Sequence, residues 1–239
     1  MARLLFDIET VGLPLDTFDA VQQEYLLRKA DTDEARAAII ESFNLTPLTA
    51  RVCCIAMLNI DSAQGRVVYL ADAASEDTLD GITFVAVTEE HELLTRFWAA
   101  IGAANTNGSL LYEKFITFNG RGFDCPFVMM RSAVLGIKPT RNLMTGGRFS
   151  KVKTHIDLME ELTFNAYGNS GATRRFNLDF YCKAFGIPTP KAEAVTGHNI
   201  NAVFAEGRYR EIAEYCVRDV RATAELFAKW HAMLWFPNE

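Results

Sequence analysis

Two carboxylates stand close together near the start of the chain, inside an apolar segment. Asp7 and Glu9 belong to the run RLLFDIETVGL, where a buried β-strand is expected to exclude charge. Side chains two residues apart on a strand point to the same face, so the two carboxylates would project together and repel each other. Two interpretations fit this pair. Either the strand reaches the surface at Asp7 and water solvates both acids, or a hard divalent cation such as Mg²⁺ or Mn²⁺ binds them.

Three more polar positions are spaced for chemistry. The run FITFNGRGFD delivers Asp124 after a predicted strand and a glycine-containing turn, just ahead of a helix, where Asp is also a common N-cap. In YCVRD, Tyr215 and Asp219 are four residues apart and therefore share one helix face. That face could be an exposed rim, but its neighbours Cys216 and Val217 are apolar, which favours a site over a solvated surface.

Strands followed by helices must position these residues. Apolar β-rich runs predict strands at 3–9, 51–60, 66–71 and 115–119, and apolar residues at three- and four-residue spacing predict helices at 89–104, 126–136, 178–186 and 212–234. This order predicts an α/β fold with a mixed central sheet flanked by helices. We expect one domain over residues 1–239, with an insertion at about 14–48 that contains a helix from Glu34 to Ser42.

Composition bounds the class of protein. The chain has 239 residues, 49% of them hydrophobic, which is enough for one large domain with an ample core. No apolar run approaches the roughly 20 residues of a membrane span, so we expect a cytoplasmic protein. The five cysteines are odd in number and form no CxxC pair, so buried reduced thiols are expected. The net charge of −6 argues against a protein that grips nucleic acid with its whole surface.

A local basic segment stands against this acidic background. From Cys125 to Ile156 there is no Asp or Glu, and the basic residues there are Arg131, Lys138, Arg141, Arg148, Lys151 and Lys153. The segment either holds phosphates or is a solvated loop, and residues 140–153 are expected to be mobile. The candidate substrate contacts are Asn119, Phe123, Phe149, Lys151 and Lys153, with the two phenylalanines as base-stacking surfaces or, alternatively, as core. His155 and His198 are expected to be polar surface or loop residues.

The motifs resemble a known family. FDIET, NGRGFD and YCVRD are similar to the three motifs of the DEDD superfamily, the DnaQ-like 3′-5′ exonucleases with a ribonuclease H-like fold. HIDLMEEL, NLDFYCKAFGIPTPK and IAEYCVRDVRATAELF resemble the predicted 3′-5′ exonucleases related to the proofreading domain of B-family DNA polymerases. The resemblance covers most of the chain from Arg3 to about Trp230, and it is weakest over residues 14–48.

The resemblance implies roles for particular residues. Asp7, Glu9, Asp124 and Asp219 would bind two divalent metal ions, Mg²⁺ or Mn²⁺, in a two-metal mechanism of phosphodiester hydrolysis. Tyr215 would place the chain in the tyrosine (DEDDy) branch; with an ordinary pKa of about 10 it would orient the attacking water instead of acting as general base. A cluster of four acids is tolerable when cations occupy it, so at least one pKa should be raised without metal.

Several functions stay open at this stage. The resemblance favours a metal-dependent 3′-5′ exonuclease on single-stranded nucleic acid, with DNA preferred by analogy to polymerase proofreading domains, and with a replication or repair protein as the expected partner. An exoribonuclease is the close alternative, because one or two contacts to a 2′-hydroxyl separate RNA from DNA. A catalytically silent binding or scaffold subunit is the third. Asp157, in HIDLM, matches an acidic position of the family for which no role is assigned.

Overall fold

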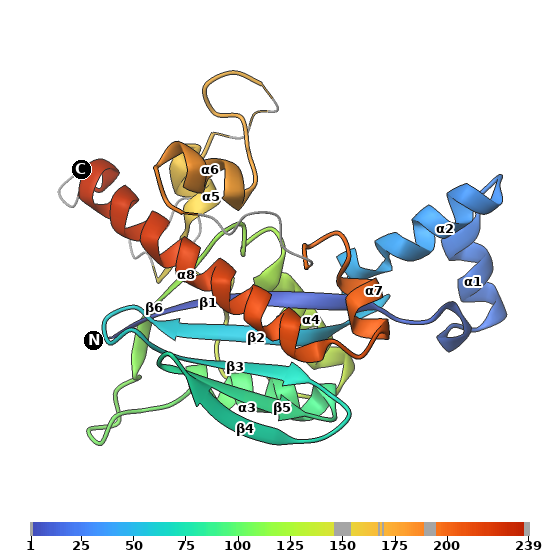
Figure 1. Ribbon diagram of the computed structural model, residues 1–239, viewed down its shortest axis with the longest axis horizontal. Coiled ribbons are helices and arrows are strands. Elements are labelled where there is room, and N and C mark those ends of the chain that lie inside the picture. The colour runs from blue at the N-terminus through green and yellow to red at the C-terminus, as the bar shows by residue number, and fades with distance from the viewer. Residues whose placement is uncertain (1, 146–153, 167, 169, 189–194, 237–239) are drawn as a thin grey trace.

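A seven-stranded mixed β-sheet forms the centre of the computed structural model, which describes residues 2–145, 154–166, 168, 170–188 and 195–236. The strand order across the sheet is β4-β5-β3-β2-β1-β6-β7 (Figure 1). The strands are β1 (Ala2–Gly12), β2 (Ala50–Asn59), β3 (Gln64–Leu70), β4 (Ser75–Leu79), β5 (Ile82–Val87), β6 (Tyr112–Thr117) and β7 (His155–Asp157). β1 runs antiparallel to β2 and parallel to β6, so the FDIET segment lies inside the sheet.

Helices cover both faces of this sheet. α8 (Tyr209–Leu234) crosses one face against β1, β2 and β3, while α3 (Glu90–Ile101) and α4 (Asp124–Val134) lie behind the sheet (Figure 1). The shorter helices are α5 (Leu158–Leu162), α6 (Leu178–Ala184) and α7 (Ile200–Ala205), and two 3₁₀ turns are η1 (Leu15–Thr17) and η2 (Ser42–Leu45). Within the described parts of the chain, no helix has the length and apolar character that a membrane crossing requires.

Large aromatic side chains fill the core between the sheet and its helices. Phe6 of β1 packs against Phe97 of α3 with ring centroids 5.4 Å apart, and both rings are essentially inaccessible to water. Trp230 of α8 is likewise buried on the other face. Such burial contributes about 1.5–3 kcal/mol for each large apolar side chain. The arrangement confirms the predicted α/β fold and is consistent with the ribonuclease H-like fold that the resemblance implies.

The segment predicted as an insertion contains two helices that project from the body as an arm (Figure 1). They are α1 (Ala20–Leu27) and α2 (Asp33–Glu41), and neither contains a buried residue. The predicted helix at 34–42 agrees with α2 to within one residue, whereas α1 was not predicted. At the base of the arm, Thr10 Oγ1 donates a hydrogen bond to the Asn44 carbonyl (2.6 Å), which ties the arm to the end of β1.

The structure contains three strands that the sequence patterns did not predict. The four predicted strands correspond to β1, β2, β3 and β6, and the four predicted long helices to α3, α4, α6 and α8. β4, SEDTL, has no apolar alternation and all five residues are exposed; it is a strand because it pairs with β5. β5 is apolar and pairs with β3, while β7 has three residues and pairs with β6. All five cysteines are buried free thiols, as predicted.

Candidate active site

Asp7 and Glu9 lie on β1 where the neighbouring strand has ended. The parallel pairing of β1 with β6 stops at Leu5, opposite Ile116, so this side of β1 has no strand partner from β6 beyond that point. Phe6 and Ile8 point into the core, and the alternation leaves both acids on the opposite, partly exposed face. Both carboxylates therefore project from the same face of β1, just beyond the point where β6 stops pairing with it.

Asp124 reaches the same place from the start of α4. Its Oδ1 accepts a hydrogen bond from the backbone N–H of Ile8 (3.1 Å), so the side chain takes the position that a β6 residue would occupy further along the ladder. Asp124 is the first residue of α4, and Phe123 is the capping position; the alternative interpretation of Asp124 as the N-cap is therefore wrong. Burial raises the pKa of Asp124 to about 7.

Asp219 and Tyr215 come to this cluster from α8. The helix packs across β1 and β2, and its Cys216 thiol donates weak hydrogen bonds to the Asp7 carbonyl (3.5 Å) and to Asp7 Oδ2 (3.6 Å). The Tyr215 hydroxyl forms a hydrogen bond with Asp219. Burial raises the pKa of Tyr215 most, and the negative charge of Asp219 raises it further. Tyr215 is therefore a hydrogen-bond donor at neutral pH.

The carboxylates of this acidic cluster repel one another when they are ionised. Burial raises the pKa of Asp7 well above its ordinary value, and the charges of Asp124, Glu9 and Asp219 raise it further, in that order. The pKa of Glu9 is raised by burial and then by Asp219 and Asp124. The expectation that at least one of the acids has a raised pKa without metal is confirmed, for three of them. The structure thus brings all four predicted acids together from β1, α4 and α8.

The donor set suits a divalent cation. The ligand atoms of Asp7, Glu9 and Cys216 all lie within 4.8 Å of one another, and the charges of Asp124 and Asp219 act on the same carboxylates. Carboxylate oxygens are the donors that Mg²⁺ and Mn²⁺ prefer, and a cation would remove the repulsion that raises these pKa values. No sequence pattern indicated the Cys216 thiol beside Asp7, because that contact depends on how α8 packs.

A cleft of about 430 Å³ opens beside the acids. It is lined by Asp7, Ile8, Phe118, Asn119, Phe123, Asp124, Met159, Arg175, Phe176, Asn177 and Leu178. Two predicted substrate contacts, Asn119 and Phe123, therefore lie on this cleft. Phe123 also packs on Phe127, with ring centroids 5.3 Å apart, so it belongs partly to the core. The other three, Phe149, Lys151 and Lys153, lie outside the described residues.

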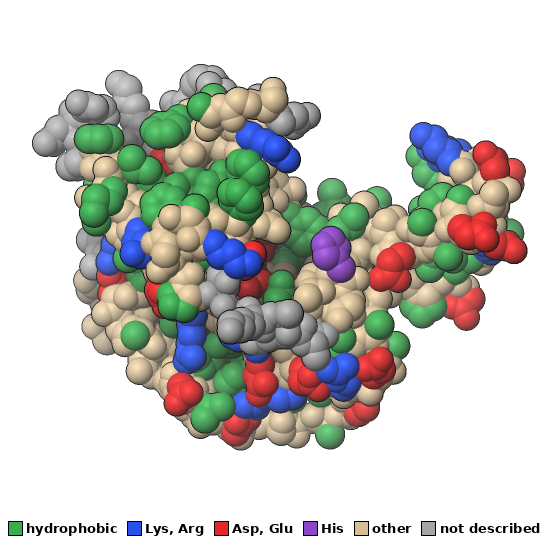
Figure 2. Space-filling model, turned by 45° about the horizontal axis from the view of Figure 1, so that its top comes forward, with side chains coloured by type: hydrophobic (Ala, Val, Ile, Leu, Met, Phe, Trp, Pro, Cys, Tyr) green, Lys and Arg blue, Asp and Glu red, His purple; other side chains and the backbone are tan. Residues whose placement is uncertain are grey.

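Two stacked phenylalanines beside a basic residue lie next to the cleft, and they were not predicted from the sequence as a stacking surface. Phe176 and Phe180 stack with ring centroids 4.2 Å apart and planes inclined by 13°, and the Arg174 guanidinium lies 4.8 Å from the Phe176 ring centroid. Phe180 is 54% exposed. Figure 2 shows hydrophobic and basic side chains gathered on this part of the surface. The signal was present in RRFNLDF, where arginines stand beside two aromatic residues at helical spacing.

The basic segment is not a continuous phosphate-binding surface in its described part. Arg131 is buried and forms a bidentate ion pair with Glu90, at 2.9 Å and 3.0 Å from Nε and 2.9 Å from Nη2. Arg141 donates from Nη1 to the Tyr112 carbonyl (2.7 Å). The Arg131 guanidinium is buried in its ion pair with Glu90, so the phosphate-binding interpretation is wrong for Arg131. Arg141 is partly exposed, and its bond to Tyr112 does not test that interpretation. The predicted mobile loop at 140–153 falls mostly outside the described residues, which end here at Thr145 and resume at Thr154.

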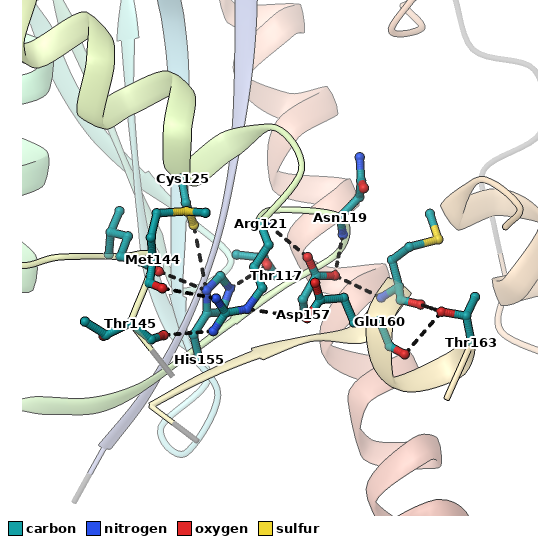
Figure 3. Close-up of polar contacts among 12 residues, drawn as sticks. Thr117, Asn119, Arg121, Cys125, Met144, Thr145, His155, Asp157, Glu160 and Thr163 are labelled. Carbon is teal, nitrogen blue, oxygen red and sulfur yellow. Dashed lines mark hydrogen bonds and ion pairs between the residues drawn. The ribbon is translucent and has the colours of Figure 1, made fainter. Parts of the chain in front are cut away.

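His155 is buried, not at the surface, so that prediction is wrong. Its Nδ1 donates to the Leu143 carbonyl (3.2 Å) and its Nε2 accepts from the Thr117 hydroxyl (2.8 Å), which joins β7 to β6 (Figure 3). Burial lowers its pKa to about 4. His198 is exposed, as predicted. Neither histidine takes part in the acidic cluster.

Two comparisons with known proteins bear on this site. A family model described as a predicted 3′-5′ exonuclease related to the exonuclease domain of PolB matches residues 42–234. The matched range contains Asp124, Tyr215 and Asp219 and begins after Asp7 and Glu9. DNA polymerase 1 of Saccharolobus solfataricus is 28% identical over 155 residues, a match that covers 62% of this chain and 16% of the polymerase. The chain is thus similar to a small part of that polymerase.

Proposed function

The chain belongs to the family of predicted 3′-5′ exonucleases related to the exonuclease domain of PolB, and from that premise we propose that it is a divalent-metal-dependent 3′-5′ exonuclease acting on single-stranded nucleic acid. One observation carries the proposal. Carboxylates far apart in the sequence, from Asp7 to Asp219, meet in one cluster beside an open cleft. Like charges held this close together cost stability, and a binding module would gain nothing from keeping them.

The four acids have distinct roles in this proposal. Asp7, Glu9 and Asp219 would hold one divalent cation, and Asp7 and Asp124 would hold a second. When bound, the cations activate the attacking water and stabilise the leaving 3′ oxygen. The chain's own contribution is to hold the carboxylates in place: the Ile8 amide fixes Asp124, and the Cys216 thiol contacts Asp7.

Tyr215 places the chain in the tyrosine branch of the DEDD superfamily in this proposal. Its raised pKa keeps the hydroxyl protonated at neutral pH, which excludes a role as general base. The hydroxyl is held by Asp219 and can orient the water that attacks phosphorus. The proton of that water would therefore pass to solvent.

The substrate is an unpaired 3′ end in this proposal. Asn119 and Phe123 contact the terminal nucleotide in the cleft, and the stacked Phe176 and Phe180 rings with Arg174 hold the bases that precede it. Aromatic stacking accepts every base, and arginine binds phosphate, so this surface suits single strands without sequence preference. DNA is preferred because the matched relative is a DNA polymerase. The whole chain forms one exonuclease domain with residues 14–48 as an insertion, and a replication or repair protein delivers the substrate.

The test is digestion of 5′-labelled single-stranded DNA and RNA of equal sequence with Mg²⁺, Mn²⁺ or EDTA. Wild-type protein should give a ladder that shortens from the 3′ end when metal is present. Asp7→Ala should give none, and Asp31→Asn, which changes an exposed acid in the arm, should behave as wild type. Cleavage of RNA alone would establish the exoribonuclease, and no cleavage of either polymer would contradict the proposal.

A further inference from the structure

Asp157 lies beneath the turn that connects β6 to α4, with its carboxylate facing backbone N–H groups. Its Oδ1 accepts from Asn119 N (2.8 Å) and from Met159 N (3.0 Å), and its Oδ2 accepts from Arg121 N (2.9 Å) (Figure 3). The residue is 2% exposed. A buried carboxylate with three backbone donors is a fixed anchor, because each charge-assisted hydrogen bond is stronger than a neutral one.

The anchored turn has a demanding geometry. Asn119 has φ of +60°, a left-handed conformation that glycine adopts most readily and asparagine more readily than most other residues. A Cβ on Gly120 would lie 2.3 Å from Thr117 Oγ1, and one on Gly122 would lie 2.8 Å from Asn119 Oδ1. Backbone held in such a conformation costs free energy and persists when the surroundings impose it. Asp157 supplies two of the contacts that impose it, at Asn119 and Arg121.

Side chains around the turn reinforce the same geometry. Arg121 lies with its Nε 3.5 Å from Glu160 Oε2, and its Nη2 donates to the Thr145 carbonyl (2.8 Å). The Cys125 amide donates to the Gly120 carbonyl (2.8 Å), which joins the turn to the first residues of α4. The strand β7 and helix α5, which flank Asp157, therefore hold one side of the segment that ends at Asp124.

We propose that Asp157 is a positioning residue for the metal site: it fixes the NGRGFD turn and thereby holds the Asp124 carboxylate against the Ile8 amide, where it faces Asp7. That the site binds metal rests on the proposed exonuclease function. The hydrogen bonds through which Asp157 holds the turn do not depend on activity. Asp157 is not one of the residues that line the cleft, and three donors already occupy its two oxygens. It acts through the backbone, and its negative charge also raises the pKa of Asp124, but it is not a metal ligand.

Asp157→Asn separates this role from the capping of α5. Asn retains one carbonyl oxygen and is itself a good N-cap, so it can keep the bond to Met159, while its amide group cannot accept from Arg121. Asp157→Ser, which also retains a capping oxygen, serves as the second variant. Ser132→Ala is the matched control: it removes buried hydrogen bonds that link α4 to Trp98 of α3 and to its own Val128 carbonyl, without touching the turn.

Two quantities are measured on the full chain. The affinity for Mn²⁺ is obtained from the electron paramagnetic resonance signal of free Mn²⁺, and the geometry of the turn and of the Asp124 contact is monitored by the backbone amide NMR resonances of Arg121 and Ile8. Removing a group that orients metal ligands lowers metal affinity about 10- to 100-fold. We expect at least a tenfold weaker Mn²⁺ affinity in both Asp157 variants and altered Ile8 and Arg121 amides. Ser132→Ala should bind Mn²⁺ as wild type does, whatever its melting temperature.

Each alternative result has a defined meaning. Asp157 variants that bind Mn²⁺ with wild-type affinity, or an equal loss in Ser132→Ala, would overturn the positioning role. If wild-type protein binds Mn²⁺ but cleaves no nucleic acid, the proposed function fails while the comparison of affinities still decides the role of Asp157. With an active enzyme, the Asp157→Asn rate should saturate at a higher Mn²⁺ concentration and recover most of its maximum, which distinguishes metal positioning from general damage.

Discussion

Asp124→Asn should stabilise the metal-free protein while abolishing its activity. The native pKa of Asp124 is about 7, against an ordinary 3.8, because burial penalises the ionised form. The folded state therefore binds more protons than the unfolded state between pH 4 and pH 7, and the stability of the wild type falls as pH rises through this range. Above pH 7 the folded protein bears the full free-energy cost of an ionised, buried Asp124, and below pH 4 this cost is absent because the carboxyl is protonated in both states. The amide that Asp124→Asn introduces is neutral at every pH, and its carbonyl oxygen can still accept from the Ile8 amide.

The size of the effect follows from the shift in pKa. About 3 pKa units at 1.36 kcal/mol each give roughly 4 kcal/mol at pH 8, an upper limit because the neighbouring acids share the proton equilibrium. At about 3 °C per kcal/mol for a chain of this length, the melting temperature should rise by up to about 12 °C. The gain should shrink to less than about 1 kcal/mol at pH 4.

Differential scanning calorimetry in EDTA across this pH range measures the gain. Asp124→Ala, which also removes the acceptor for Ile8 N–H, should be less stable than Asp124→Asn. Millimolar Mg²⁺ should stabilise the wild type and have little effect on either variant. An Asp124→Asn protein no more stable than wild type in EDTA at pH 8, or a stability difference that does not change with pH, would show that Asp124 carries no such ionisation penalty.

Four further outcomes follow from other contacts. Tyr215→Phe should slow turnover about tenfold without abolishing it, in a single-turnover assay, because the hydroxyl orients water and does not take its proton. His155→Gln should make the free energy of unfolding less dependent on pH below 6.5. Because the native pKa of His155 is about 4, wild-type protein should lose up to about 3 kcal/mol of this free energy as pH falls from 6.5 to 4, and urea unfolding at each pH measures the loss. Arg131→Met should cost about 3–5 kcal/mol in the same assay, because it leaves the buried Glu90 carboxylate unpaired. Phe180→Ala should raise KM for single-stranded oligonucleotides several-fold with kcat unchanged, in steady-state kinetics.

Elements with a strong local pattern could be predicted from the sequence. β1 is an apolar run interrupted mainly by its two acids, and α8 has apolar residues at helical spacing along its length, so both were predicted with boundaries close to the observed ones. The strands β4 and β7 could not be predicted, because one is fully exposed and the other has three residues. Both are strands through pairing with partners elsewhere in the chain.

The residues of the site likewise divide into those that a local pattern predicts and those that only tertiary packing brings together. Spacing alone placed Asp7 with Glu9 and Tyr215 with Asp219, since strand and helix periodicities are local. The hydrogen bond between Asp124 and Ile8, 116 residues apart, depends on the end of the β6 ladder and was not predicted; the resemblance alone implied that Asp124 joins the other three acids. Burial of His155 and Arg131 was missed because their partners, Leu143 and Glu90, are brought near by packing and not by spacing.

Release of nucleotides from the 3′ end tests the proposed exonuclease activity. A single-stranded oligonucleotide labelled in its 3′-terminal nucleotide is incubated with wild-type protein and Mg²⁺ or Mn²⁺, beside the same oligonucleotide with a blocked 3′ end. Metal-dependent 3′-5′ hydrolysis predicts a labelled nucleoside 5′-monophosphate from the open end, none from the blocked end, and none in EDTA or with Asp124→Asn. Release from the blocked strand, release without metal, or undiminished release by Asp124→Asn would contradict it.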